Sequence, residues 1–276
     1  MRIIYIDIDT LRADHLGCGG YHRNTSPNID NVASAGINFR NVYASDVPCL
    51  PSRTALITGM FGIRNGVINH GGRAADLQPE GKDRGFFGRF SMRSWASVFY
   101  LAGWHTASIS SFPFRHGASW WNSGFMESMN LMRGFGGERA DQVIPGALDW
   151  LERRGKADDW FLHVHLWDPH TPYRTPEDYG NPFESDPVPS WHTEDVRMAN
   201  WDLAGPHSAQ EPWGFRPDEW GEPPPRQPWN ASSMDAVKQI FDGYDVGIRY
   251  ADAVSYTHLR AHETVLELVC RLLLEK

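Results

Sequence analysis

The chain has few cysteines and no excess of positive charge. Only 3 of its 276 residues are cysteine, too few for the disulfide framework that holds small secreted domains together. Acidic residues outnumber basic ones by 34 to 26, and the formal net charge of -8 argues against a nucleic-acid-binding surface. An anionic ligand would therefore have to be attracted by local cations rather than by the charge of the whole protein.

Long apolar runs and a secretory signal are also missing. No run of about 18 apolar residues occurs, so the sequence predicts no membrane-spanning helix. Met1 and Arg2 lead directly into an apolar segment without the pattern of a signal peptide. We therefore expect a cytoplasmic protein that acts on neither membranes nor nucleic acids.

Strand-like and helix-like segments alternate along the chain. This alternation is typical of one large α/β domain, in which a mostly parallel sheet is covered by helices on both faces. We expect the strands at residues 2–8, 37–44, 104–110 and 161–166, and the helices at residues 27–36, 52–58, 94–102, 142–154 and 234–253.

Residues 174–231 differ in composition from the rest. They are rich in Pro, Trp, Asp and Glu and include three consecutive prolines at 223–225. This composition predicts an irregular excursion over the surface that serves as a lid or a substrate-recognition insert. Its tryptophans are suited to stacking on sugar rings, but they could equally bury a loosely built insert.

Residues 49–53 read CLPSR and form an unusual local group. Pro51 suits the first turn of a helix because it has no N–H, and Gly59 suits the helix end. We therefore expect Cys49 at a helix N-terminus, where backbone N–H groups favour negative charge. Arg53 follows one turn later with a guanidinium fork suited to an oxyanion. The same residues are compatible with a buried cysteine before an ordinary helix.

Two aspartates lie at the end of the first predicted strand. Asp7 and Asp9 are two residues apart, so they share one face of the strand near its carboxyl end. Carboxylates this close repel each other unless a cation or hydrogen-bond donors lie between them. Oxygen ligands suit Ca²⁺ or Mg²⁺, and open α/β sheets bind ligands at this edge. An isolated Asp-x-Asp could also form an Asx-turn or a helix N-cap.

Histidines accompany the strand predicted at residues 161–166. His163 and His165 alternate along it, and His170 follows where Asp-Pro interrupts the strand. We expect His163 to be a hydrogen-bonded core residue, and His165 to be either structural or part of a site. Another histidine, His70, lies in a predicted loop after the helix that carries Arg53. It either lines the same pocket as Cys49 and Arg53 or is an ordinary loop residue.

Three segments together resemble the type I, formylglycine-dependent sulfatases of the alkaline-phosphatase-like superfamily. Residues 9–17, DTLRADHLG, are similar to the metal-binding segment of that family, and CLPSR is similar to its cysteine signature. Residues 163–170, HVHLWDPH, resemble a third segment whose last histidine contacts the sulfate ester. The order and spacing of the three segments match the family, and the resemblance covers about residues 1–252.

The resemblance implies a mechanism. Cys49 would be oxidised to formylglycine by a formylglycine-generating enzyme or its equivalent, and the hydrated aldehyde would be the nucleophile. Asp9, Asp7 and the group at position 49 would bind Ca²⁺, or alternatively Mg²⁺ or Mn²⁺. Arg53 would hold the diol, and His170 would bind the ester. The substrate would be a sulfate ester of a small molecule or a carbohydrate.

The chain departs from the family pattern in two places. The family usually has two adjacent aspartates, whereas here Thr10 follows Asp9, and we expect Asp7 to compensate. The Lys-x-His pair of the family is replaced by Arg115 and His116, which we expect to supply the cation and the acid.

The last residues, 254–276, are predicted to lie outside the natural domain, which we place at residues 1–253. They look helical, but residues 255–264 and 268–276 each resemble a reading frame of a sequencing adapter. The resemblance to sulfatases places further metal ligands, a catalytic lysine and a smaller C-terminal domain beyond this point. We therefore expect an incomplete, inactive and aggregation-prone fragment.

Three other functions are compatible with the sequence. A phosphonate or phosphate ester hydrolase of the same superfamily would share the formylglycine and the metal. A non-catalytic binding protein would keep Cys49 unmodified. A cysteine hydrolase would use Cys49 as a thiolate at the helix N-terminus and would need no metal.

Overall fold

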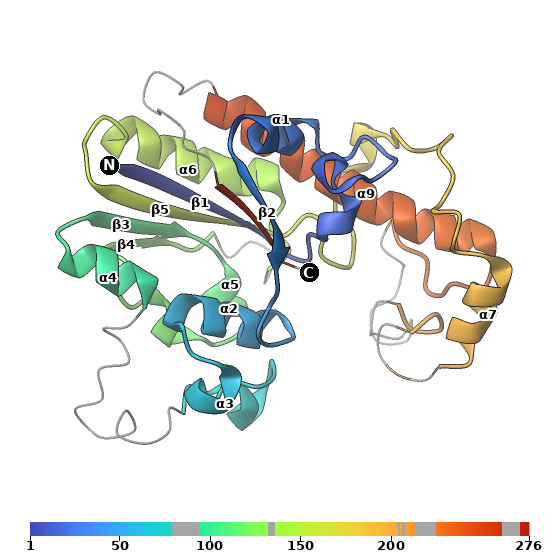
Figure 1. Cartoon of the computed structure of the whole chain (residues 1–276), viewed down its shortest axis with the longest axis horizontal. Coiled ribbons are helices and arrows are strands. Elements are labelled where there is room, and N and C mark those ends of the chain that lie inside the picture. Colours follow the sequence, from blue (N-terminus) through green and yellow to red (C-terminus); the bar gives the residue numbers. More distant parts are fainter. Residues whose placement is uncertain are drawn as a thin grey trace.

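A parallel sheet with helices on both faces forms the centre of the molecule (Figure 1). The computed structural model describes residues 1–78, 94–131, 136–203, 205, 208–212, 225–260 and 271–275, the segments 257–260 and 271–275 as backbone only. The order of the strands is β1-β5-β3-β4, and each neighbouring pair is parallel. These strands are β1 (Arg2–Ile8), β3 (His105–Ile109), β4 (Glu127–Met129) and β5 (Trp160–Leu166).

The central strand β5 is buried along its whole length. This burial explains why its sequence, WFLHVHL, is apolar apart from two histidines, as is typical of a parallel strand covered on both faces. Its register with β1 pairs Asp7 with His165 and Tyr5 with His163. The predicted acidic and histidine side chains therefore lie next to each other on one face of the sheet.

Helices cover the sheet as the periodicity predicted. Helix α6 (Ala140–Arg154) packs on β5 and β3 through Val143, Ala147 and Trp150, which are all buried. Helix α4 (Trp95–Leu101) contacts the same two strands and lies across the sheet from α6 (Figure 1).

The long helix α9 (Met234–Arg260) lies late in the chain but packs against elements from its beginning and middle. It packs against α6 and against α1 (Pro27–Ala35). The buried carboxylate of Asp252 accepts hydrogen bonds from the backbone N–H groups of Asn28 and Ile29 at 3.1 and 2.7 Å. These N–H groups lie in the first turn of α1 and have no partner within the helix, so Asp252 caps α1 from another element.

Several short elements were not predicted. They include a helix inside the excursion, α7 (Glu194–Trp201), which Thr193 caps by accepting a hydrogen bond from the Val196 N–H. The excursion is therefore not entirely irregular. The others in the described residues are α3 (Gly62–Asn65), α5 (Phe112–Arg115), β4 and five short 3₁₀ turns. Elements of three or four residues are too short to show a hydrophobic period.

A second, two-stranded parallel sheet joins β2 (Ile37–Val42) to β6 (Arg271–Glu275). The end of the chain looked helical from its sequence. Helix α9 does continue to Arg260, but residues 271–275 form a strand.

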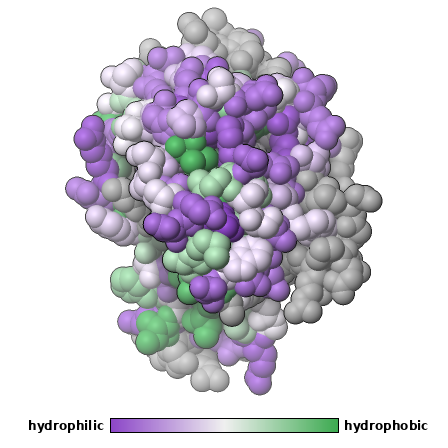
Figure 2. Space-filling model, turned by 90° about the vertical axis from the view of Figure 1, so that its right-hand side faces the viewer, coloured by the Kyte–Doolittle hydropathy of each residue, from purple (hydrophilic) through white to green (hydrophobic). Residues whose placement is uncertain are grey.

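The surface is mainly polar on the side shown in Figure 2, where α7 and the neighbouring end of α9 face the viewer. Hydrophobic residues gather there toward the lower edge of the view. None of the helices in the described residues combines the length and the hydrophobicity that a membrane-spanning segment needs.

Candidate active site

Asp7 of β1 and Asp9, which follows the strand, meet the guanidinium group of Arg53 at the carboxyl end of the sheet. Arg53 donates from Nε and Nη2 to the two oxygens of Asp7 at 2.6 and 2.7 Å. Its third nitrogen, Nη1, lies 3.2 Å from Oδ2 of Asp9. All three side chains are almost inaccessible to water, with exposed fractions of 9% for Arg53, 13% for Asp7 and 0% for Asp9. The cation between the two carboxylates in this structure is therefore Arg53.

This arrangement keeps both carboxylates charged. Burial alone would raise their pKa values, but the positive charge of Arg53 and the contacts with neighbouring histidines together outweigh it and hold the pKa of both Asp7 and Asp9 well below the usual range. Burial likewise disfavours the charged form of Arg53, yet the two carboxylates raise its pKa further. The guanidinium also lies over the ring of Phe112, 4.8 Å from its centre, which adds a cation–π contact.

The histidines of β5 stand beside this ion pair. Nε2 of His165 lies 3.6 Å from Oδ2 of Asp9 and 3.8 Å from Oδ2 of Asp7. Nδ1 of His163 lies 2.9 Å from the hydroxyl of Ser108, and His163 is fully buried, as expected of a core histidine. His165, whose role the sequence left open, is in contact with the candidate site.

Cys49 is the first residue of α2 (Cys49–Thr58), where the sequence placed it. Its Sγ lies 3.0 Å from Nε2 of His70 and 3.8 Å from Nε2 of His116. The two imidazole rings are 4.9 Å apart. The fold therefore brings the cysteine and two histidines together from three separate segments.

The thiol of Cys49 is not activated as a thiolate. Burial and the negative charge of Asp9 raise its pKa to about 12, although Arg53 and Arg115 act in the opposite direction. The sequence predicted that the helix N-terminus favours negative charge at this position. The hydrogen bond from the Leu50 backbone N–H does lower the pKa of the thiol, but burial and the nearby carboxylate outweigh this effect.

The histidines around Cys49 are held in the neutral form. Burial lowers the pKa of His116 to about 3, and the neighbouring His70 and Arg115 contribute to this shift. Burial also lowers the pKa of His70, and it lowers that of His170 to about 4. His170 lies in the turn after β5, with its Nδ1 against the carbonyl of Thr171 and its ring against that of Trp167.

Positive charge reaches the site from Arg115, at the end of α5. Its guanidinium lies 4.8 Å from the ring centre of Trp167, and Nη1 donates to the carbonyl of Gly136 at 3.0 Å. Gly136 has a φ of +85°, and a Cβ there would collide with the Arg115 side chain, so glycine is required. Arg174, which the sequence analysis did not single out, is a second cation nearby. Burial and Arg115 lower its pKa to about 10.

The residues fit a divalent cation in part. Both carboxylate oxygens of Asp9 are buried without a hydrogen-bond partner among the described residues, which suits a hard cation that binds oxygen. Both oxygens of Asp7 accept hydrogen bonds from Arg53, so in this structure Asp7 orients that arginine rather than offering a free metal ligand. Within the described ranges, no three His, Cys, Asp or Glu residues are arranged to hold a metal.

Comparison with known proteins identifies the family. Residues 2–255 match the family model described as Sulfatase. The chain belongs to the sulfatase family. It is 24% identical over 203 residues to an uncharacterized sulfatase of Escherichia coli, a match that covers 64% of this chain and 40% of the relative. Human arylsulfatase A is 40% identical over 65 residues, 24% of this chain and 13% of the relative.

Solved structures share the fold of this sulfatase-family chain. One is a putative sulfatase from Bacteroides thetaiotaomicron, with a TM-score of 0.63 and 14% identity over 94% of this chain and 54% of the other. Another is a phosphonate monoester hydrolase of Agrobacterium radiobacter, with a TM-score of 0.61 and 16% identity over 95% of this chain and 59% of the other. The chain thus spans little more than half of these structures.

Replacing Asp7 by Asn tests the ion pair at the end of β1. Asp7→Asn leaves a buried guanidinium with one charged partner instead of two, and we expect the free energy of unfolding to fall by about 3 kcal/mol. Urea denaturation measures this change. Asp14→Asn is the matched control, because Asp14 pairs with Arg12 on the surface and such pairs contribute about 1 kcal/mol or less. Equal effects of the two substitutions would contradict the assignment.

The neutral state of His116 predicts a pH dependence of stability. Its pKa is about 3 in the folded protein and about 6.5 when unfolded, so between these values the unfolded state binds more protons. The stability due to neutral His116 is therefore present above about pH 6.5 and is lost as the pH falls, by at most about 1.4 kcal/mol per pH unit.

We expect His116→Gln to lose less stability than the unchanged protein between pH 7 and pH 5, as measured by urea denaturation at each pH. Burial raises the pKa of Asp168 to about 7, which gives the opposite slope, but this contribution is common to both proteins and cancels in the comparison. Parallel pH profiles would contradict a buried, neutral His116.

Proposed function

We propose that the intact protein hydrolyses sulfate esters with a formylglycine formed from Cys49. Membership of the sulfatase family supports the reaction class. The observation that carries the proposal is the position of Cys49, which lies at the start of α2 against His70 and His116. The buried Asp9 is close enough to Cys49 for its charge to raise the pKa of the thiol.

Two groups from outside the polypeptide would complete the chemistry. Asp9 would hold a divalent cation, Ca²⁺ or alternatively Mg²⁺ or Mn²⁺, which would polarise the sulfate oxygens. Formylglycine at position 49 would supply a geminal diol, one oxygen of which displaces the alcohol from sulfur while the other later expels sulfate. Both oxygens would be bonded to Cβ, so the Sγ atom of Cys49 marks roughly where one of them would lie.

The side chains around position 49 then have separate tasks. His70 is neutral, and its Nε2 lies 3.0 Å from Sγ, so it is placed to accept a proton from a hydroxyl at position 49. His116 and His170 would position the bound ester, and the leaving oxygen would take up the proton that His70 accepts. Arg115 offsets the negative charge of the sulfate group. Arg53 is held by Asp7 and Asp9, so it fixes the acidic pair rather than gripping the diol.

The state of the thiol disfavours a cysteine hydrolase. Such an enzyme needs a thiolate near neutral pH, whereas the pKa of Cys49 is raised to about 12. A phosphonate or phosphate ester hydrolase would use the same groups as a sulfatase. Rates on sulfate, phosphate and phosphonate monoesters, measured side by side on the intact protein, would separate these two activities.

Two further questions concern the substrate and whether the 276-residue chain is active by itself. We propose a sulfated small molecule or carbohydrate as the substrate, and a formylglycine-generating enzyme as the maturation partner. A cytoplasmic location stays a prediction. At the candidate site Asp9 is the described carboxylate whose oxygens lack a hydrogen-bond partner, and one of them lies 3.2 Å from Arg53, so the site offers far fewer than the about 6–8 oxygen ligands of Ca²⁺. We therefore expect the 276-residue chain to be inactive on an aryl sulfate.

Peptide mass spectrometry tests whether Cys49 is modified. After co-expression with a formylglycine-generating enzyme, we expect the peptide with Cys49 to lose the mass that separates a CH₂SH side chain from an aldehyde. The peptide with Cys18, a second free cysteine of intermediate exposure, is the internal control and should keep its mass. An unchanged Cys49 in a chain that is otherwise folded would contradict the proposed nucleophile and favour a non-catalytic binding protein.

A further inference from the structure

The turn that follows Asp9 is held by a residue from the far end of the chain. The hydroxyl of Tyr244, on α9, donates to the carbonyl of Thr10 at 2.6 Å and accepts from the N–H of Arg12 at 2.9 Å. One hydroxyl therefore bridges both sides of the turn immediately after the acidic pair. The two backbone groups are 234 and 232 residues away from Tyr244 in sequence.

This turn needs external support. Thr10 has a φ of +57°, in the left-handed region that β-branched residues rarely adopt. Such a conformation costs on the order of 1 kcal/mol and persists only where the surroundings hold it in place. Asp9 precedes this residue directly, and its N–H continues the sheet by donating to the carbonyl of Leu166 at 2.9 Å. The sheet thus fixes one side of Asp9, and Tyr244 fixes the other.

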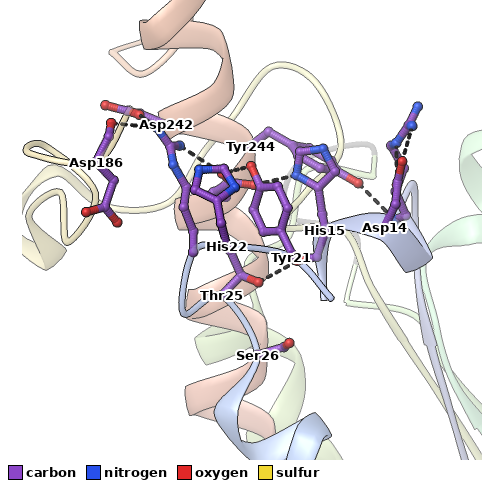
Figure 3. A network of polar contacts seen from close by, with 12 residues as sticks. Asp14, His15, Tyr21, His22, Thr25, Ser26, Asp186, Asp242 and Tyr244 are labelled. Atoms are coloured by element: carbon purple, nitrogen blue, oxygen red, sulfur yellow. Dashed lines mark hydrogen bonds and ion pairs between the residues drawn. The ribbon is translucent and has the colours of Figure 1, made fainter. Parts of the chain in front are cut away.

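The position of Tyr244 is itself fixed by a buried polar network between α9 and the N-terminal segment. Figure 3 shows His15, Tyr21 and Tyr244 close together beside α9. The neighbouring carboxylate of Asp245 lies 2.7 Å from Nδ1 of His15 and accepts from the Tyr21 hydroxyl at 2.8 Å. Nη1 of Arg23, a fully buried residue, donates to the same carboxylate at 2.8 Å. Because these contacts surround one turn of α9, the helix has little freedom to shift.

We infer that Tyr244 is a positioning residue for the cation site, and that it aims the Asp9 carboxylate by locking the turn of residues 9–12. Tyr244 acts through the backbone of the turn, and its hydrogen bonds go to Thr10 and Arg12 rather than to Cys49, His70 or His116. The inference rests on the proposed function in one respect, the role of Asp9 as a ligand of a divalent cation. It adds that α9 and the first strand must be docked together before this ligand is in place.

Ca²⁺ binding to the 276-residue chain tests the inference through two matched tyrosine substitutions. Tyr244→Phe removes the hydroxyl that bridges the turn. Tyr21→Phe removes a hydroxyl from the same network, where it bonds to Asp245 and not to the turn. The dissociation constant for Ca²⁺ is measured by calorimetric titration, and the thermal midpoint Tm of each variant is measured in a chelator.

We expect Tyr244→Phe to weaken Ca²⁺ binding about 10-fold, the scale usual for loss of a residue that orients a metal ligand. Tyr21→Phe should leave the affinity unchanged, because His15 and Arg23 still hold the Asp245 carboxylate. Both variants should lower Tm in the chelator to a similar degree, because each loses one hydrogen-bonding hydroxyl. A purely structural role for Tyr244 would give similar Tm changes and no selective loss of affinity, and that result would overturn the inference.

Asp9→Asn separates failure of the inference from failure of the metal role. If Asp9→Asn abolishes Ca²⁺ binding and Tyr244→Phe does not weaken it, the proposed cation site stands and the positioning role is wrong. If Asp9→Asn binds Ca²⁺ as the unchanged chain does, or if the unchanged chain binds none at millimolar Ca²⁺, both the cation site and the positioning role are overturned.

Discussion

The buried contact between Arg53 and the carboxylates of Asp7 and Asp9, at the end of β1, is the interaction on which the rest of the site depends. Two carboxylates without water between them would repel each other strongly, and a buried charge is tolerated only when it is paired. Arg53 meets this need, with its fork on Asp7 and its remaining nitrogen near Asp9. Because Arg53 lies one helical turn after Cys49, the same contact fixes the start of α2 against the end of the sheet.

A site built on this contact draws on distant parts of the chain. The strand pairing of β1 with β5 sets the two aspartates beside His165, and the turn after β5 supplies His170. The end of α5 contributes Arg115, and α9 returns after the excursion to lie along the N-terminal segment (Figure 1). The site therefore exists only when the whole domain has folded, since no segment holds enough of it alone.

Periodicity and local chemistry predicted much of this structure. The alternation along β1 put Asp7 and Asp9 on one face, and Pro51 and Gly59 marked the helix that starts at Cys49. The sequence could not predict that Arg53 pairs with the aspartates instead of facing an oxyanion, because that choice depends on the distance between α2 and β1. The sequence could not predict the hydrogen bond from Tyr244 to Thr10 either, since the two residues are 234 positions apart.

A crystal structure of the chain grown with Ca²⁺ would show whether Asp9 holds the cation beside position 49. We expect a cation about 2.3–2.6 Å from a carboxylate oxygen of Asp9, on the side that faces position 49, with Arg53 still bonded to Asp7. A structure in which Cys49 lies on the opposite side of the fold from Asp9, or in which Ca²⁺ binds elsewhere and leaves Asp9 without it, would contradict the account.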